Sequence, residues 1–260
     1  MAIGRTILGM LTQAHRREHR EAISETWAAR LPTGWSLYFL IGRPGRATEL
    51  VGDVLYLDME EAYENLPLKI HLFMQYCVEN EAFDGLLKCD DDVYLDIELL
   101  RSVIGRKPAY AGRRCPRTDW WGRSLFDPTW HFGKCTDPVI DRTPYQGAAD
   151  GYYCDGGVGY FVDRRCAEIV GDPANRGHFE RELYEDKAVG DLLREHGIVA
   201  DFLPERLYET PAKNRWRLFR RNGLLAVHPL SPEAIREAWR RQNASSCLAR
   251  LGWRSPPRRA

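Results

Sequence analysis

The chain has 260 residues, in which 37 Lys and Arg residues balance 37 Asp and Glu residues and 44% of the side chains are hydrophobic. This length and apolar content can form a packed core, which excludes an intrinsically disordered protein. A formal charge of zero argues against a dedicated nucleic-acid-binding protein, although bases without acids gather at 213–221 and 240–260. These basic stretches suit a phosphate-bearing ligand or weak peripheral contact with a membrane, but a solvated basic surface is the commoner explanation.

The N-terminal stretch, MAIGRTILGMLTQ, is too short and too broken by polar residues to be a secretory signal. No run approaches the ~18 apolar residues that cross a bilayer. The seven cysteines show no CxxC spacing, which favours reduced thiols over a disulfide framework or a zinc site. The sequence therefore predicts a soluble, cytoplasmic protein.

The first part of the chain alternates between two kinds of apolar pattern. Short apolar runs predict strands at 5–12, 36–42, 53–58 and 84–89. Apolar residues at helical spacing predict helices at 16–30, 63–80 and 95–104. Strands that alternate with helices indicate an α/β fold with a mostly parallel, doubly wound sheet.

The second part begins with a segment, 113–150, that is rich in Arg, Asp, Pro, Gly and Trp and has no sustained period. A stretch of this length without regular structure is typical of a functional loop or lid. The elements predicted after it are a hairpin-like stretch at 151–163, helices near 164–171 and 183–196, a strand at 223–228 and a helix at 231–241.

Three consecutive carboxylates, Asp90, Asp91 and Asp92, directly follow the predicted strand at 84–89. They would lie at its carboxyl end, where open α/β sheets bind ligands. Asp90 and Asp92 would point the same way, and two charges so close are costly without a cation. Carboxylate oxygens favour Mg²⁺ or Mn²⁺. An Asp-rich turn or a cap of the next helix is an equally good explanation.

Three further patterns suit a site, and each also has a structural explanation. Glu185 and Asp186 begin a predicted helix, where a carboxylate acts as a general base or simply complements the helix dipole. The glycines around Gly156 and Gly157 would let a ligand approach the backbone, or they form a tight hairpin. His228 ends a predicted strand, and a lone histidine is more often structural than a ligand.

Six segments occur in a fixed order along the chain: REAISETW at 20–27, YFLIG at 38–42, DVLYLDMEEAYENLPLK at 53–69, DDD at 90–92, YCDGGVGY at 153–160, and ED followed by glycine at 185–190. Together they resemble six motifs of the inverting β-1,3-glycosyltransferases, the family of the β-1,3-galactosyltransferases, the β-1,3-N-acetylglucosaminyltransferases and Fringe. Asp90–Asp92 match the DDD form of that family's DxD motif. The resemblance covers about residues 5–240.

The resemblance implies one GT-A-like nucleotide-sugar-binding domain at 1–245, with a donor half at 1–112, an acceptor half at 113–245, and a basic tail at 246–260. It implies metal-dependent transfer of a hexose or N-acetylhexosamine from a UDP-sugar to a hydroxyl of a glycan acceptor, with inversion to a β-1,3 linkage. Mn²⁺ is the first choice of metal and Mg²⁺ the second, because manganese accepts imidazole more readily.

At the matching positions, the resemblance implies a catalytic base at Asp186 and metal ligands at Asp92 and His228. The residues expected at the donor are Arg20, Asp90 and Asp91. The residues expected to bind substrate are Trp120, Trp121, Asp155, Gly156, Gly157 and Glu185. Trp130, in the same long loop as the first two tryptophans, would stack on a sugar or pack the loop onto the domain.

Four positions depart from the family pattern and bear on donor and acceptor choice: Ser24, Pro67, Asp155 and Lys187. The sequence also shows no counterpart of the anchor and stem of the Golgi members, so a Golgi-lumen location would require a trimmed chain. Two other functions fit the same residues. One is a non-catalytic carbohydrate- or nucleotide-binding protein of the same fold, and the other is a metal-dependent phosphohydrolase built on the acidic triplet.

Overall fold

The structure, a computed structural model, describes residues 4–115, 127–147, 152–211 and 223–250. The strands are β1 Thr6–Leu11, β2 Trp35–Gly42, β3 Glu49–Val51, β4 Val54–Leu57, β5 Gly85–Asp90, β6 Tyr94–Leu95, β7 Tyr110–Arg113, β8 Tyr160–Asp163, β9 Asp201–Leu203, β10 Tyr208–Glu209 and β11 Ala226–Val227. The helices are α1 Arg17–Glu25, α2 Leu66–Asn80, α3 Ile97–Ile104, α4 Arg164–Gly171, α5 Arg176–Arg181, α6 Glu185–Glu195 and α7 Pro232–Arg250.

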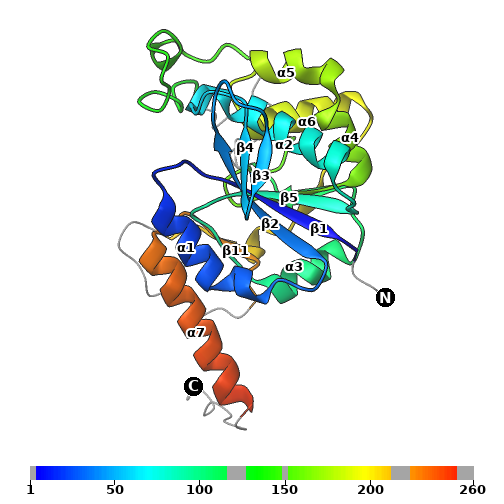
Figure 1. Ribbon diagram of the computed structural model, residues 1–260. Coiled ribbons are helices and arrows are strands. Elements are labelled where there is room, and N and C mark those ends of the chain that lie inside the picture. The colour runs from blue at the N-terminus through cyan, green and yellow to red at the C-terminus, as the bar shows by residue number, and fades with distance from the viewer. Residues whose placement is uncertain (1–3, 116–126, 148–151, 212–222, 251–260) are drawn as a thin grey trace, which may run out of the picture.

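A large mixed sheet forms the centre of the molecule (Figure 1). Its strand order over the described residues is β3-β4-β2-β1-β5-β8-β7-β9. The strands from β4 to β5 pair in parallel, whereas β8 runs antiparallel to both of its neighbours. A small second sheet has the order β10-β11-β6. The α/β fold predicted from the sequence is confirmed, and it fits a single GT-A-like domain.

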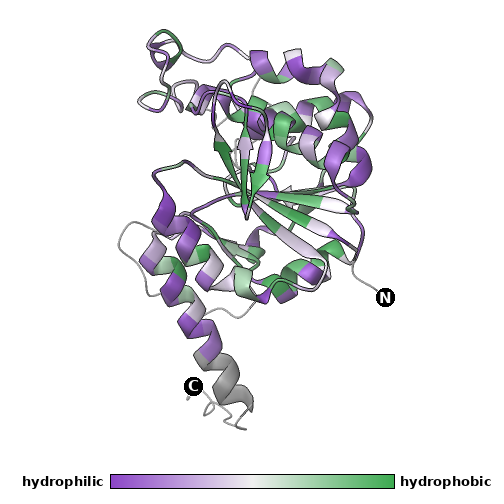
Figure 2. Ribbon diagram, in the orientation of Figure 1, coloured by the Kyte–Doolittle hydropathy of each residue, from purple (hydrophilic) through white to green (hydrophobic). Residues whose placement is uncertain are grey.

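Helices cover both faces of the large sheet, which explains why β1 is buried along its whole length. On one face, Ile7 and Leu11 pack with the apolar sides of α2, α4 and α6. On the other face, Leu8 and Met10 pack with α1, α3, α7 and the small sheet. Figure 2 shows hydrophobic strands inside and hydrophilic outer surfaces on the helices. A strand with two buried faces reads as a continuous apolar run, and this is how the sequence presents it.

The predicted helix at 16–30 is shorter in the structure. Helix α1 ends at Glu25, and a 3₁₀ turn follows at Trp27–Arg30. Thr26 leaves the helical conformation and its hydroxyl donates to the Ala22 carbonyl. The break turns Trp27 into the core, where its ring nitrogen donates to the Val93 carbonyl at 3.1 Å. Tertiary burial of one large side chain therefore overrides the helical pattern.

The hairpin expected at 151–163 is wrong. Over the described residues 152–163 the one strand is β8, and it pairs with β5 and β7, which come earlier in the chain. Cys154 contributes a single bridge to Arg114. The predicted strand at 223–228 is reduced to β11 in the small sheet. The short elements β3, β6, β7, β9, β10 and α5 were not expected from the sequence, because segments of two to six residues are too short to show a period.

The described part of the predicted loop, 127–147, contains one short 3₁₀ turn, Ile140–Arg142, and is otherwise irregular. Trp120 and Trp121 lie outside the described residues. Helix α7 runs through residue 245, where the sequence analysis placed the end of the domain; the division into halves and a tail stays a prediction. In the part of the chain that the structure covers, no helix is both long and apolar enough to cross a membrane.

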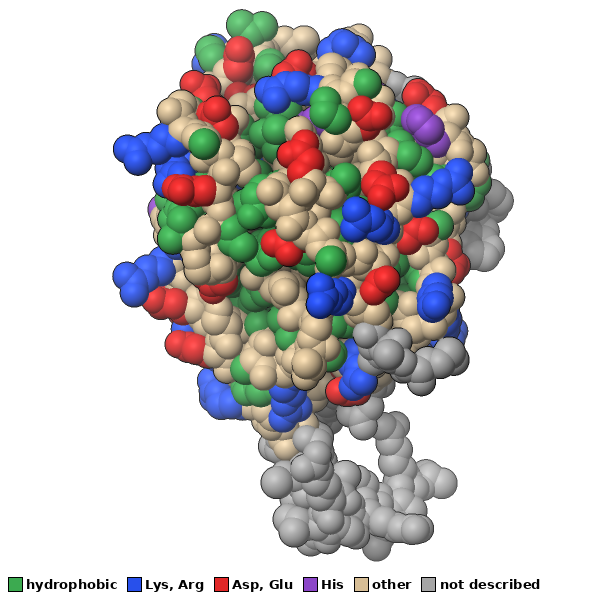
Figure 3. Space-filling model, turned by 45° about the vertical axis from the view of Figure 1, so that its right-hand side comes forward, with side chains coloured by type: hydrophobic (Ala, Val, Ile, Leu, Met, Phe, Trp, Pro, Cys, Tyr) green, Lys and Arg blue, Asp and Glu red, His purple; other side chains and the backbone are tan. Residues whose placement is uncertain are grey.

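On the face shown in Figure 3, basic and acidic side chains are interspersed, in keeping with the balanced composition. Some charged side chains of the protein pair within their own helix, as in Arg17–Glu21 of α1, Arg164–Glu168 of α4 and Arg176–Glu180 of α5. Such exposed pairs contribute little to stability, so the burial of apolar side chains is the main stabilising term.

A buried lysine holds the carboxyl ends of three strands together. Lys69 Nζ donates to the Thr12 carbonyl after β1 at 2.8 Å and to both oxygens of Glu61 after β4, at 2.6 and 2.7 Å. Glu61 in turn accepts from the Gly42 amide, at the end of β2, at 2.7 Å. The sequence block at 53–69 therefore supplies both members of an ion pair that fixes this edge of the sheet.

We expect Lys69→Met to lower the free energy of unfolding by about 3 kcal/mol, because the change leaves a carboxylate without its buried partner. Urea denaturation followed by circular dichroism would measure this loss. Lys107→Met is the matched control, since Lys107 is exposed. Equal midpoints for the two variants would show that the Lys69 ion pair does not stabilise the fold.

One histidine on α2 is enclosed by helices. His71 is fully buried, its Nδ1 lies 2.7 Å from the Val170 carbonyl oxygen, and its ring stacks on Phe179 at 5.2 Å between centroids. Its Nε2 has no hydrogen-bond partner among the described residues. Burial lowers the pKa of His71, although the bond to Val170 partly opposes this. The neutral ring is therefore the native form.

Because the pKa of His71 is lower in the folded than in the unfolded chain, the unfolded chain binds more protons below about pH 6.5. We expect stability to fall as the pH drops below that value, until the folded pKa is passed. His71→Gln should lose less stability than the wild type between pH 7 and pH 5, measured as urea midpoints. His15→Gln, at an exposed position, should follow the wild type. Parallel curves for all three would contradict this role of His71.

Candidate active site

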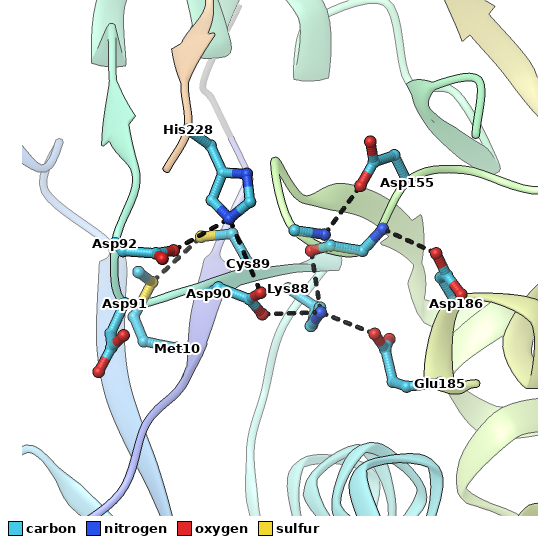
Figure 4. A network of polar contacts seen from close by, with 12 residues as sticks. Met10, Lys88, Cys89, Asp90, Asp91, Asp92, Asp155, Glu185, Asp186 and His228 are labelled. Atoms are coloured by element: carbon cyan, nitrogen blue, oxygen red, sulfur yellow. Dashed lines mark hydrogen bonds and ion pairs between the residues drawn. The ribbon is translucent and has the colours of Figure 1, made fainter. Parts of the chain in front are cut away.

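The acidic triplet lies at the carboxyl end of β5, which is central in the large sheet. Asp90 and Asp92 point toward His228 (Figure 4). His228 Nε2 lies 3.0 Å from Asp92 Oδ1 and 4.0 Å from Asp90 Oδ2. One ligand atom from each residue lies within 4.8 Å of the other two. We call Asp90, Asp92 and His228 the cation cluster.

The small sheet brings His228 to the triplet from more than 130 residues away in sequence. Strand β11 pairs antiparallel with β6, which follows the triplet directly, so that Val227 lies opposite Tyr94. The Leu230 amide donates to the Asp92 carbonyl at 2.8 Å and fixes the chain beyond the histidine. The backbone therefore sets the distance between His228 and the carboxylates.

Burial and the neighbouring charges both shift the pKa values of the three residues in the cation cluster. Burial raises the pKa of Asp90 to about 6, and the nearby charge of Asp92 adds to the rise although Lys88 opposes it. Burial also acts to raise the pKa of Asp92, but His228 outweighs it and the net pKa is lowered. Burial acts to lower the pKa of His228, but Asp92 and Asp90 raise it above its ordinary value. The cluster therefore attracts positive charge.

The donor set fits a divalent cation. Asp92 Oδ1 is buried and receives no well-directed hydrogen bond from the described residues, despite its closeness to His228. A buried oxygen in this state is costly unless a cation or water satisfies it. Two carboxylates and an imidazole suit Mn²⁺ and, with more water ligands, Mg²⁺. The identity of the metal stays a proposal.

Asp91 lies in the turn after β5, and its side chain points away from the cation cluster, toward Arg16 and Thr12. Its carboxylate accepts from Arg16 Nε at 2.8 Å on both oxygens and from the Thr12 hydroxyl. The Asp91 side chain is only 4% exposed. The structure thus gives Asp91 a role in joining β5 to the segment between β1 and α1, and it does not bring Asp91 together with the other two carboxylates.

Arg20, expected at the donor, is directed to the same segment between β1 and α1. Its guanidinium donates to the Gln13 carbonyl at 2.7 Å and to the Ala14 carbonyl at 3.3 Å. The sequence analysis assigned nothing to Arg16, which pairs with Asp91. The signal for it was weak, since Arg16 is one of several bases at the start of a helix.

Helix α6 presents two carboxylates in its first turn, Glu185 and Asp186. Asp186 is half-buried, and its Oδ2 accepts from the Gly156 amide at 3.4 Å. Glu185 is buried and accepts from Lys88 Nζ at 2.7 Å and from the Tyr160 hydroxyl. The two neighbours therefore differ: Glu185 is directed into the protein, and Asp186 lies at its edge.

A glycine turn separates α6 from the cation cluster (Figure 4). The Gly157 carbonyl accepts from the Asp90 amide at 3.4 Å, and the Gly157 amide donates to Asp155 at 3.0 Å. A Cβ on Gly156 would lie 2.5 Å from Glu185 Oε2, and one on Gly157 would lie 2.7 Å from His228 Cε1. Only glycine lets the backbone pass between these side chains, so the tight turn also serves the site.

The structure adds Lys88 to the site. Its Nζ donates to Asp90, Glu185 and the Gly156 carbonyl (Figure 4). Burial acts to lower the pKa of Lys88, but the charges of Asp90 and Glu185 outweigh it and raise it, so the amine is charged. The sequence analysis assigned no role to this lysine, which lies within the predicted strand at 84–89. A charged residue inside an apolar strand was the available signal.

Segment 127–147 is attached to the start of α6 by two side chains. His131 is fully buried, and its Nδ1 lies 3.0 Å from the hydroxyl of Tyr184, the residue before Glu185. The Tyr145 hydroxyl donates to Glu182 at 2.8 Å. On the outside of the segment, Trp130 is 57% exposed and carries the Lys134 ammonium 3.7 Å above its ring centroid. The segment thus forms a wall next to the helix that carries Asp186.

Comparison with known proteins agrees with this geometry. A family described as Galactosyltransferase matches residues 18–203, which include the acidic triplet and Asp186. The chain belongs to the galactosyltransferase family. The family prediction made from the sequence motifs is therefore confirmed.

Two relatives in the mouse, Mus musculus, illustrate the likeness. UDP-GalNAc:beta-1,3-N-acetylgalactosaminyltransferase 2 is 36% identical over 198 residues, which are 72% of this chain and 33% of that protein. Beta-1,3-galactosyltransferase 6 is 26% identical over 241 residues, which are 85% of this chain and 68% of that protein. The human N-acetylgalactosaminyltransferase 2 is 25% identical over 204 residues. The chain spans about a third of the length of the N-acetylgalactosaminyltransferases that it matches.

We expect Gly157→Ala to weaken Mn²⁺ binding at least tenfold, because the new methyl group would displace His228 from the cation cluster. Isothermal titration calorimetry with MnCl₂ would measure the change. Gly177→Ala, in helix α5, is the control: its Cβ would meet only the flexible end of Arg181. Unchanged Mn²⁺ affinity in folded Gly157→Ala would contradict a metal role for His228.

Proposed function

We propose that the protein is a metal-dependent inverting glycosyltransferase, which moves a hexose or N-acetylhexosamine from a UDP-sugar to a hydroxyl group of a glycan and forms a β-1,3 linkage. One observation carries the proposal. The cation cluster and Asp186 lie on opposite sides of one glycine turn, at the carboxyl edge of the sheet. The same glycine turn therefore contacts both the site for an anionic leaving group and the candidate base.

The donor side rests on Asp90, Asp92 and His228, which would hold a divalent cation, with Mn²⁺ the first choice. Bound there, such a cation supplies positive charge to a diphosphate leaving group. Asp91 and Arg20 would act on the donor only indirectly, by fixing the segment between β1 and α1. The family name and the names of the relatives support a sugar-transfer reaction, and the relatives differ in the sugar that they name.

The acceptor side rests on Asp186. In the proposed reaction, its carboxylate takes the proton of the attacking hydroxyl group while the acceptor oxygen forms a bond to the anomeric carbon. The bond from that carbon to the phosphate oxygen breaks, and UDP leaves with the electron pair. Attack opposite the leaving group converts an α-linked donor into a β product. Asp155 and the glycine turn would line the space between the two sides.

The wall formed by segment 127–147 supports a glycan as the acceptor. Exposed aromatic rings such as Trp130 and Phe132 offer flat surfaces for the faces of sugars. Trp120 and Trp121 belong to the same proposal, from outside the described residues. The wall would also exclude water, which otherwise hydrolyses the donor. The cytoplasmic location stays a prediction from the sequence.

We expect Asp186→Asn to lower kcat about 10²–10⁴-fold, the usual contribution of a positioned base, and to leave the binding of UDP with Mn²⁺ unchanged. UDP release from each UDP-sugar, measured with and without Mn²⁺ and a glycan acceptor, would test this. Asp92→Ala should abolish Mn²⁺-dependent UDP binding. Asp201→Asn, at an exposed position on β9, is the control.

Two results would reject the proposal. Phosphate release without any acceptor, unaffected by Asp186→Asn, would indicate a phosphohydrolase. Sugar or UDP binding without turnover of any donor would indicate a binding protein of the same fold.

A further inference from the structure

We infer that Lys88 is a positioning residue that couples the cation cluster to the base-bearing helix α6, so that neither side of the site is correctly placed without it. The inference rests on the proposed function, because it assigns Lys88 to the donor and acceptor sides named there. It goes beyond the resemblance to the family, which assigned no role to Lys88.

The first argument is the set of partners. The side chain of Lys88 is 1% exposed, and its ammonium meets acceptors from three separate segments. These are Asp90 Oδ1 of the cation cluster at 3.1 Å, the Gly156 carbonyl of the glycine turn at 2.9 Å, and Glu185 Oε2 of α6 at 2.7 Å. An ammonium has three N–H groups, so its donors are all used. Each bond fixes a different part of the site.

The second argument is that hydrogen bonds fix both carboxylate oxygens of Glu185. One of its oxygens accepts from Lys88 and the other from the Tyr160 hydroxyl of β8. Strand β8 pairs with β5 itself, at Lys88 opposite Tyr160. The start of α6 is therefore bound to the central strands through Glu185, and Asp186 follows as the next residue. This geometry favours a positioning role for Glu185 over direct contact with the substrate.

The third argument is electrostatic and makes the inference testable. Lys88 places a positive charge beside Asp90, which by itself repels a bound cation. If charge were its main effect, removal of the ammonium would strengthen Mn²⁺ binding. If positioning were its main effect, removal would release Asp90 and weaken Mn²⁺ binding. The sign of the change separates the two roles.

The decisive variant is Lys88→Met, which keeps an unbranched side chain one atom shorter and removes the charge and the donors. We expect Mn²⁺ affinity, measured by calorimetry with MnCl₂ alone on the folded full chain, to fall at least tenfold. Lys187→Met is the matched control. Lys187 is also a buried lysine, on α6, but it pairs with Glu182 and Asp191 and touches no member of the cation cluster. Its loss should leave Mn²⁺ affinity within twofold.

A second variant keeps the inference testable if Lys88→Met does not fold. Glu185→Gln is nearly isosteric and retains an oxygen that can accept from Lys88 or Tyr160. We expect it to lower kcat at least tenfold, with the KM for the UDP-sugar within threefold, because α6 is loosened while the cation cluster stays in place. If Lys88→Met folds, combining it with Glu185→Gln should lower kcat no more than Lys88→Met does alone. The effects of two substitutions in one hydrogen-bond network do not add.

Unchanged or stronger Mn²⁺ binding in Lys88→Met would overturn the inference, and so would a Lys187→Met variant that weakens binding equally. If Lys88→Met does not fold, a kcat in Glu185→Gln equal to that of the wild type would overturn it. These results are distinguishable from failure of the proposed function. If the wild type turns over no donor but Lys88→Met still binds Mn²⁺ more weakly, the proposed glycosyltransferase function is wrong. The positioning of the cation cluster by Lys88 is then still supported.

Discussion

The structure depends on a concentration of negative charge at the end of one buried strand. Asp90 and Asp92 face the same side, and Glu185 and Asp186 approach them from α6. Such a group of carboxylates is tolerated only where cations are near. Lys88 Nζ lies 3.1 Å from Asp90 and His228 Nε2 lies 3.0 Å from Asp92, whereas the third carboxylate of the triplet, Asp91, is paired separately with Arg16. Each carboxylate of the triplet therefore has a basic partner, and the space between Asp90 and Asp92 remains suited to a metal ion.

The order of the strands makes this arrangement possible. Strand β5 lies between the parallel strand β1 and the antiparallel strand β8. The parallel side supplies the segment after β1, with Thr12 and Arg16. The antiparallel side supplies the glycine turn that precedes β8 and the contact to α6. The change in strand direction between β5 and β8 thus brings two different kinds of segment to the end of β5.

The start of α6 shows how a departure from the family pattern is accommodated. The residue after Asp186 is Lys187, one of the four departures, and its side chain is buried. It pairs with Glu182 and Asp191, and Glu182 also receives the hydroxyl of Tyr145. These contacts tie segment 127–147 to α6. Buried charges in this setting act through their partners, since an unpaired ammonium would be costly there.

The sequence by itself determined the family and the α/β class, and it predicted the acidic residues of the candidate site. These follow from local patterns: apolar runs, carboxylates directly after a strand, and glycines at fixed spacing. It did not determine which carboxylates act together. Only the tertiary structure separated Asp91 from its neighbours, brought His228 to Asp92 through pairing of β11 with β6, and gave Lys88 its three partners. It also replaced an expected local hairpin with the pairing of β8 to strands far away in sequence. These features depend on contacts between distant segments, and a distant contact leaves no period or spacing in the chain that carries it.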